Sequence, residues 1–151
     1  MTKATLDAPI RTSASQLERI LSAGHPTLVV FEVSGCEPCA SLAATLDSLA
    51  REYAGRALVV RVGDADQGWL AARYHLFYVP TLLFWHRGGE RARIKGDPGR
   101  AAIGAHLEFM LTGVSPPVPA SGPRHTLQAA FDPSRRRRRG PPAGLLAAPP
   151  A

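Results

Sequence analysis

The sequence is poor in cysteine: its only two, Cys36 and Cys39, are separated by two residues. A second cysteine pair is lacking, and the five histidines do not occur at the spacing typical of zinc modules, which disfavours a closed zinc site. A structural staple is disfavoured as well, because the ring would enclose only two intervening residues in a chain whose 45% hydrophobic content suffices for a core. A redox-active dithiol is therefore the favoured interpretation of the pair.

Long apolar runs are also lacking. No segment approaches the ~18 consecutive apolar residues of a membrane span, and the first residues contain no apolar run of signal-peptide length. We therefore expect a cytoplasmic protein without a membrane span. In a reducing compartment, two cysteines this close are more often catalytic than permanently bridged.

Charge and proline are unevenly distributed along the chain. Residues 1–113 contain 12 basic and 11 acidic side chains, whereas residues 114–151 contain six arginines, one aspartate and nine of the 14 prolines. This composition predicts a lead segment at 1–14, one folded domain at 15–113 and a disordered tail at 114–151. The arginines at 135–139 are expected to be solvated, with no specific nucleic-acid partner, because few aromatic residues accompany them.

The hydrophobic period changes repeatedly within the predicted domain, as in a protein that mixes helices and strands. Helices are expected at residues 14–23, 39–54, 69–74 and 101–111, and strands at residues 27–33, 57–62, 81–85 and 91–94. Ser15 and Glu18 are expected to form a capping box at the start of the first helix. The cysteine pair falls between the first of these strands and the second helix. The predicted fold class is therefore α/β.

Several short motifs occur in a characteristic order. They are the run Gly35, Cys36, Glu37, Pro38 and Cys39, the helix ending at residues 51–56, Tyr74 ahead of Val79, Pro80 and Thr81, the turn of Gly88, Gly89 and Glu90, and Gly96. Together they resemble the thioredoxin superfamily from about Ser15 to Gly113. The resemblance implies a thioredoxin fold, with a central mixed β-sheet flanked by helices. It also implies a monomeric thiol–disulfide oxidoreductase without a cofactor, whose partners are protein disulfide or dithiol substrates and a reductase.

The position of the cysteines explains how each would react. Cys36 is expected at the N-terminus of the second helix, where unpaired N–H groups and the helix dipole favour an anion and lower the pKa of the thiol. Cys36 is therefore predicted to be the nucleophile, and Cys39, one helical turn deeper, to resolve the mixed disulfide. Pro38 lacks an N–H that the start of a helix can spare, and it fixes the turn.

A proline in the later tripeptide completes the resemblance. In the superfamily this proline is cis and faces the cysteines. The resemblance implies that the backbone of Val79 binds an extended substrate segment as an additional strand, with the substrate disulfide over Cys36. Val79 and Pro80 are thus the predicted substrate-binding residues, and Gly96 supports the site.

The chain departs from the usual thioredoxin pattern at four positions. Gly35 stands in place of a tryptophan, Glu37 in place of a glycine, Val30 in place of a buried aspartate, and Arg61 in place of the lysine that accompanies this aspartate. The charge of Glu37 should raise the pKa of Cys36 relative to glycine at that place and make the couple more reducing.

The missing aspartate would have helped to deprotonate Cys39. Glu32, two residues beyond Val30 on the same strand face, is the candidate replacement; the alternative is a solvated acid at the mouth of the site. These departures predict a specialised or slower oxidoreductase. The alternative function is a thioredoxin-fold binding or chaperone-like module with little redox turnover.

Overall fold

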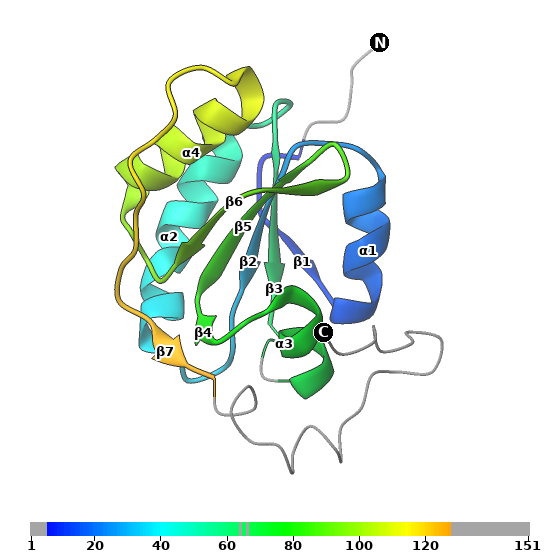
Figure 1. Ribbon diagram of the computed structural model, residues 1–151, viewed down its shortest axis with the longest axis vertical. Coiled ribbons are helices and arrows are strands. Elements are labelled where there is room, and N and C mark those ends of the chain that lie inside the picture. The colour runs from blue at the N-terminus through cyan, green and yellow to red at the C-terminus, as the bar shows by residue number, and fades with distance from the viewer. Residues whose placement is uncertain (1–5, 64, 66, 128–151) are drawn as a thin grey trace.

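The computed structural model describes residues 6–63, 65 and 67–127 (Figure 1). The helices in these residues are α1 (Ala14–Ser22), α2 (Glu37–Glu52), α3 (Gly68–Tyr74) and α4 (Arg100–Thr112). The strands are β1 (Ile10–Thr12), β2 (Thr27–Phe31), β3 (Leu58–Val62), β4 (Tyr78–Val79), β5 (Thr81–His86), β6 (Gly89–Lys95) and β7 (His125–Thr126). No helix in the described part of the chain combines the length and the apolar character that crossing a membrane requires.

Five strands form a central sheet in the order β1-β3-β2-β5-β6. β1, β3 and β2 are parallel, whereas β5 and β6 are antiparallel, so the sheet is mixed as predicted. β2 is the middle strand, and all five of its residues are buried, which explains why its sequence is apolar on both faces. Its register places Val30 beside Arg61 of β3 and beside Leu82 of β5.

Helices cover both faces of the sheet (Figure 1). The core under α1 and α3 contains Leu17, Leu21, Val29, Phe31, Val60, Val62, Leu70 and Tyr74. The core under α2 and α4 contains Leu28, Val30, Leu42, Leu46, Leu49, Leu82, Phe84, Ile103 and Leu107. Successive residues of β2 thus alternate between the two cores, as the geometry of a strand requires.

The predicted helices and longer strands are confirmed, with differences at their ends. α2 begins at Glu37, two residues before the predicted start, and β2 ends at Phe31, two residues before the predicted end. The predicted capping box is wrong. α1 begins after Ser13, which makes no side-chain cap, and Ser15 lies within the helix with its Oγ 3.0 Å from Ser13 Oγ.

Both ends of the domain differ from the boundaries expected from the sequence. β1 lies in the predicted lead segment and pairs with β3. Residues 114–127, expected to begin a disordered tail, follow α4 down the side of the molecule to β7, which pairs with β4 (Figure 1). We call residues 114–127 the return segment. Residues 128–151, the rest of the predicted tail, lie outside the described residues.

Candidate active site

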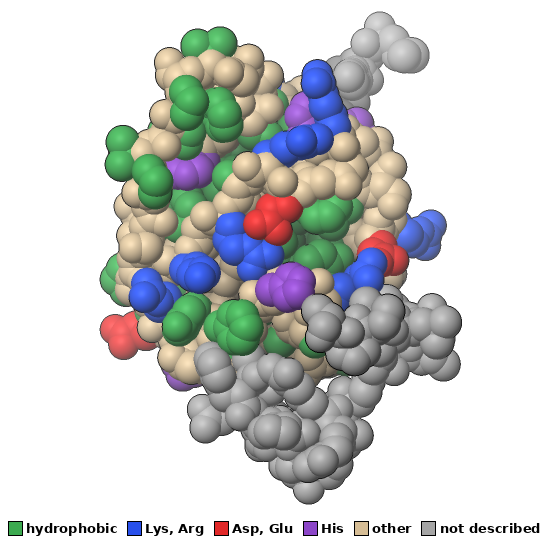
Figure 2. Space-filling view, in the orientation of Figure 1, with side chains coloured by type: hydrophobic (Ala, Val, Ile, Leu, Met, Phe, Trp, Pro, Cys, Tyr) green, Lys and Arg blue, Asp and Glu red, His purple; other side chains and the backbone are tan. Residues whose placement is uncertain are grey.

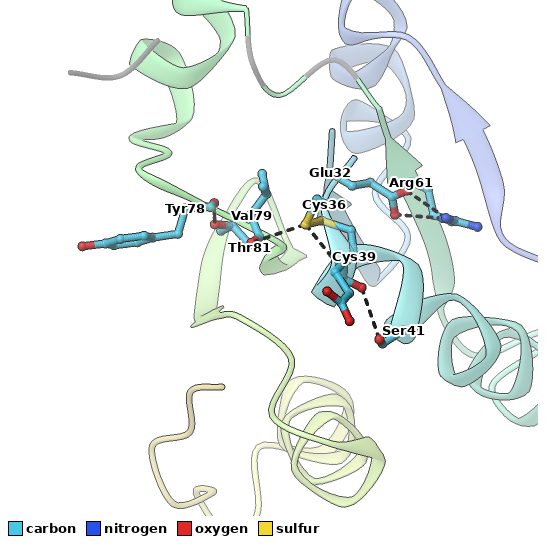
Figure 3. Close-up of a disulfide and its surroundings, with 9 residues drawn as sticks. Glu32, Cys36, Cys39, Ser41, Arg61, Tyr78, Val79 and Thr81 are labelled. Carbon is cyan, nitrogen blue, oxygen red and sulfur yellow. Dashed lines mark hydrogen bonds and ion pairs between the residues drawn. A yellow bond between two sulfur atoms is a disulfide. The ribbon is translucent and has the colours of Figure 1, made fainter. Parts of the chain in front are cut away.

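Cys36 and Cys39 are joined by a disulfide at the start of α2 (Figure 3). Cys36 is the N-cap residue, and its Sγ accepts a hydrogen bond from the backbone N–H of Cys39 at 3.2 Å. Pro38 lies in the first turn, where its missing N–H removes no hydrogen bond of the helix. The sulfur of Cys36 therefore accepts a hydrogen bond from an N–H group that has no partner within the helix. Cys36 lies at the start of the helix, as the sequence predicted, and Cys39 lies inside it.

The backbone around the disulfide accounts for one departure from the family pattern. Gly35 has a φ of 78°, in the left-handed region that glycine adopts without the steric cost of a Cβ atom. A tryptophan at this position would be strained in the same conformation. Each cysteine is only 3% exposed, so the reactive atoms are almost fully enclosed in the disulfide form.

The loop that carries Pro80 lies beside the disulfide. The bond between Val79 and Pro80 is cis, as the resemblance implied. The carbonyl oxygen of Val79 is 3.8 Å from Cys36 Sγ (Figure 3). Gly96 supports the loop from the end of β6, where its N–H donates a hydrogen bond to the Pro80 carbonyl at 2.7 Å. The structure thus brings together the cysteines and the predicted substrate-binding backbone.

A buried ion pair lies on the other side of the disulfide (Figure 3). Both carboxylate oxygens of Glu32 accept hydrogen bonds from the guanidinium of Arg61, at 2.8 and 2.9 Å. Each side chain is 11% exposed. These hydrogen bonds from Arg61 to the carboxylate raise the pKa of the guanidinium above its ordinary value. The alternative expectation for Glu32, a solvated acid at the mouth of the site, is wrong.

The Thioredoxin family model matches residues 9–108. The chain belongs to the thioredoxin family. Among its relatives, "Thioredoxin M-type, chloroplastic" of Spinacia oleracea is 28% identical over 99 residues, which are 66% of this chain and 55% of the spinach protein. "Thioredoxin" of Synechocystis sp. (strain ATCC 27184 / PCC 6803 / Kazusa) is 31% identical over 104 residues, which are 68% of this chain and 96% of that protein. The chain therefore spans little more than half of the spinach relative.

A solved thioredoxin structure has the same fold. A mutant thioredoxin from Halobacterium salinarum NRC-1 superposes with a TM-score of 0.68, over 76% of this chain and 100% of that chain, at 23% sequence identity. The thioredoxin match begins one residue before β1, which explains why β1 belongs to the domain rather than to a lead segment. It ends within α4, so the return segment lies outside the part of the chain that matches the thioredoxin family.

The sequence reasoning missed the contribution of the return segment to this site. β7 pairs with β4, the strand that contains Val79, and Leu127 is only 2% exposed. The available signal was weak: a β-branched Thr126 followed by a leucine, within a segment whose proline content indicates disorder. A two-residue strand forms only because a partner edge is already in place.

Proposed function

We propose that the chain is a thiol–disulfide oxidoreductase that acts on protein substrates, with Cys36 as nucleophile and Cys39 as resolving thiol. The observation that carries the proposal is the position of the Cys36 sulfur. It caps α2, it is bonded to the Cys39 sulfur, and it lies 3.8 Å from the carbonyl oxygen of Val79. The helix N-terminus stabilises a thiolate at Cys36 and so favours its attack on a disulfide.

The reaction proceeds through two thiol–disulfide exchanges. The Cys36 thiolate attacks one sulfur of the substrate disulfide, and the other substrate sulfur leaves as a thiolate. The Cys39 thiolate then attacks Cys36 Sγ, the bond between Cys36 and the substrate breaks, and the second substrate sulfur leaves. Two electrons pass from the cysteine pair to the substrate, and the chain ends in the disulfide form that the structure describes.

The proposed function requires a surface that binds the substrate and a source of electrons. We propose that Val79 and Pro80 bind an extended substrate segment through the backbone, with Gly96 and Pro38 supporting the loop and the helix start.

Because each turnover leaves a disulfide, a reductase must return two electrons to it. We further propose that the protein acts as a monomer in the cytoplasm, where such a reductant is maintained; the spinach relative, by its name, is chloroplastic.

Trapping the mixed disulfide tests these roles. In a Cys39→Ser variant the second exchange is blocked, so Cys36 should accumulate a disulfide with a protein substrate, detectable by non-reducing electrophoresis and mass spectrometry. The matched Cys36→Ser variant should trap almost no mixed disulfide with a protein substrate. Trapping by the Cys36→Ser variant instead would reverse the assigned roles.

The reduction potential separates this function from a binding or chaperone-like module. The Cys36 and Cys39 pair should interconvert reversibly between dithiol and disulfide in redox buffers and should turn over a protein disulfide. A pair that equilibrates with buffer but never reduces a protein disulfide would favour the binding module. The absence of any reversible equilibrium would exclude the oxidoreductase.

A further inference from the structure

The last part of the return segment is fixed to the end of β6. The N–H of Gly122 donates a hydrogen bond to the Lys95 carbonyl at 3.1 Å, and the N–H of Asp97 donates one to the Pro123 carbonyl at 3.0 Å. Lys95 and Ser121 form an isolated parallel bridge at the same place. The segment is therefore held by backbone hydrogen bonds before it reaches β4.

β7 then uses the backbone edge that a substrate would need. The N–H of Leu127 donates a hydrogen bond to the Phe77 carbonyl at 2.9 Å, and the register pairs His125 with Val79. Hydrogen-bonded pairs alternate along an antiparallel ladder, so the next such pair after Phe77 and Leu127 is Val79 and His125. The N–H and carbonyl of Val79 consequently face β7.

The side chain that follows β7 is buried with the reactive residues. Leu127 is 2% exposed and belongs to the same buried cluster as Cys36, Cys39 and Val79. An aliphatic side chain with so little exposure adds a substantial hydrophobic contribution to the docking of the segment. β7 is thus held by packing as well as by strand pairing.

Close backbone approach and a contact with an aromatic ring also fit the segment to its site. A Cβ atom on Gly96 would overlap the Gly122 carbonyl, and one on Gly122 would overlap the Asp97 carbonyl, so both glycines permit the close approach. The Arg124 guanidinium carbon is 4.9 Å from the centre of the Tyr78 ring, within the range of a cation–π contact. Lys and Arg side chains gather on this face (Figure 2), so it is the Tyr78 ring, and not an opposite charge, that favours Arg124 here.

We propose that residues 121–127 are an internal occupant of the substrate-binding edge and must leave it before a protein substrate can dock. The proposal rests on the proposed function, since it takes the backbone of Val79 as the place where a substrate strand binds. The N–H and carbonyl of Val79 face a single direction and cannot pair with β7 and with a substrate strand at once. The chain therefore has a closed state, which the structure describes, and an open state with β4 free.

This equilibrium sets how fast the enzyme acts on proteins. Only the open fraction binds substrate, so the apparent affinity is the intrinsic affinity reduced by that fraction. Substitutions that weaken the docking of residues 121–127 should therefore accelerate reduction of a protein disulfide. They should leave the chemistry of the cysteines in place.

Three full-length variants weaken the docking by different means. Leu127→Ser removes the buried side chain, Gly122→Ala introduces the overlap with the Asp97 carbonyl, and the milder Arg124→Gln removes the contact with the Tyr78 ring. Val118→Ser is the matched control, because Val118 lies in the same segment and is 82% exposed. Circular dichroism and thermal unfolding establish that each variant is folded.

The readout is the initial rate of insulin disulfide reduction, with dithiothreitol as the reductant. Leu127→Ser and Gly122→Ala should raise this rate about tenfold, because losing one buried leucine is enough to change a docking equilibrium by that factor. Arg124→Gln should give a smaller increase, and Val118→Ser should match the parent. Unchanged or lower rates in folded variants would overturn the proposal; if the first two fail to fold, Arg124→Gln decides.

A peptide supplies an independent arm of the test. A synthetic peptide of residues 120–127 should inhibit the Leu127→Ser variant and leave the parent almost unaffected, because the parent site is already filled. Equal inhibition of both chains would contradict internal occupancy. Failure of the proposed function looks different: the parent and all variants would then show no reversible dithiol and disulfide equilibrium in dithiothreitol buffers, whatever their rates.

Discussion

Glu32 and Arg61 form a two-point ion pair, with both carboxylate oxygens accepting hydrogen bonds at 2.8 and 2.9 Å. Arg61 is the register partner of Val30, the position at which thioredoxins usually have a buried aspartate. The carboxylate that pairs with Arg61 thus belongs to a residue two positions further along the chain than Val30. Because each side chain is 11% exposed, removing either charge leaves the other poorly solvated.

Removing the Glu32 charge should destabilise the domain. We expect Glu32→Gln to lower the free energy of unfolding by about 2 kcal/mol, because an enclosed guanidinium loses its counter-charge and one of two charged hydrogen bonds. Urea unfolding measures this loss, provided that the slope of the unfolding free energy against urea concentration is the same in the parent and the variant. Glu90→Gln is the matched control, since its ion pair with Arg93 is more exposed and should contribute less than about 1 kcal/mol. Equal losses in both variants would contradict the argument.

The missing aspartate can be restored at Val30. Val30→Asp should speed release of a thiol bound to Cys36, because a nearby carboxylate helps to form the Cys39 thiolate. It should also reduce stability, since Val30 is fully buried and an aspartate there would compete with Glu32 for Arg61. Single-turnover release of the bound thiol, followed in the parent and the variant, measures the effect.

Two further variants show what the result of this measurement means. Val30→Asn should lose similar stability without the gain in rate, because it adds polarity but no base. If Val30→Asp is folded and no faster while Glu32→Gln is markedly slower, Glu32 already acts as the base. A parent rate too slow to measure, unaffected by either substitution, would instead favour the binding module.

The two thiols should differ in reactivity when the disulfide is reduced. In the disulfide form each cysteine is 3% exposed, so exposure there does not distinguish them, whereas their positions on α2 do. Cys36 caps the helix, where its sulfur receives an N–H group, and its thiol should ionise at lower pH than that of Cys39. Iodoacetamide labelling at several pH values, analysed by peptide mass spectrometry, should modify Cys36 first. Preferential labelling of Cys39 would overturn the assignment.

A contact far from the cysteines should make stability depend on pH. Tyr53 Oη donates a hydrogen bond to Glu108 Oε2 at 2.6 Å and joins the end of α2 to α4. Burial and this bond raise the pKa of Tyr53 to about 12. The folded state thus keeps the phenolic proton longer than the unfolded chain. Stability should therefore fall as the pH rises from about 10 through about 12.

Glu108 gives the opposite dependence in acid. Hydrogen bonds from Tyr53 and Arg56 lower the pKa of its carboxyl, so the stabilisation exists above the ordinary pKa and is lost as the pH falls through the lowered value. Tyr53→Phe should remove the alkaline limb and reduce the acid limb, because Arg56 still binds Glu108. Glu108→Gln should remove the acid limb and reduce the alkaline limb, because the bond to Glu108 is one cause of the raised pKa of Tyr53. Denaturant midpoints across pH measure these slopes, and a parent profile without either limb would refute the coupling.

The elements that could be predicted are those whose own sequence determines them. β2 was evident because its four apolar residues, 28–31, face two cores, and α2 because Leu42, Leu46 and Leu49 recur at helical spacing after the cysteine pair. These periods arise from burial against the sheet, so local pattern and tertiary structure agree. The thioredoxin motifs then placed the cysteines and Pro80 together.

The strands that were missed depend on partners elsewhere in the chain. β1, β4 and β7 have two or three residues each, too few to show a period. β7 lies in a proline-rich stretch and pairs only because β4 offers an open edge. The pairing of Glu32 with Arg61 was missed for a related reason: it depends on the register between β2 and β3, which a list of residues does not contain.

The burial of Leu127 also fixes where the remaining chain is attached. The described part of the chain ends at Leu127, next to β4 and in the same buried cluster as Cys36, and not at the end of α4. The first arginine of the basic run is eight residues beyond Leu127, so even a fully extended chain holds it within about 30 Å of that leucine. A tag, label or second domain fused after Leu127 would be attached to the domain at the same point. In the closed state it would be held at a high local concentration around Cys36.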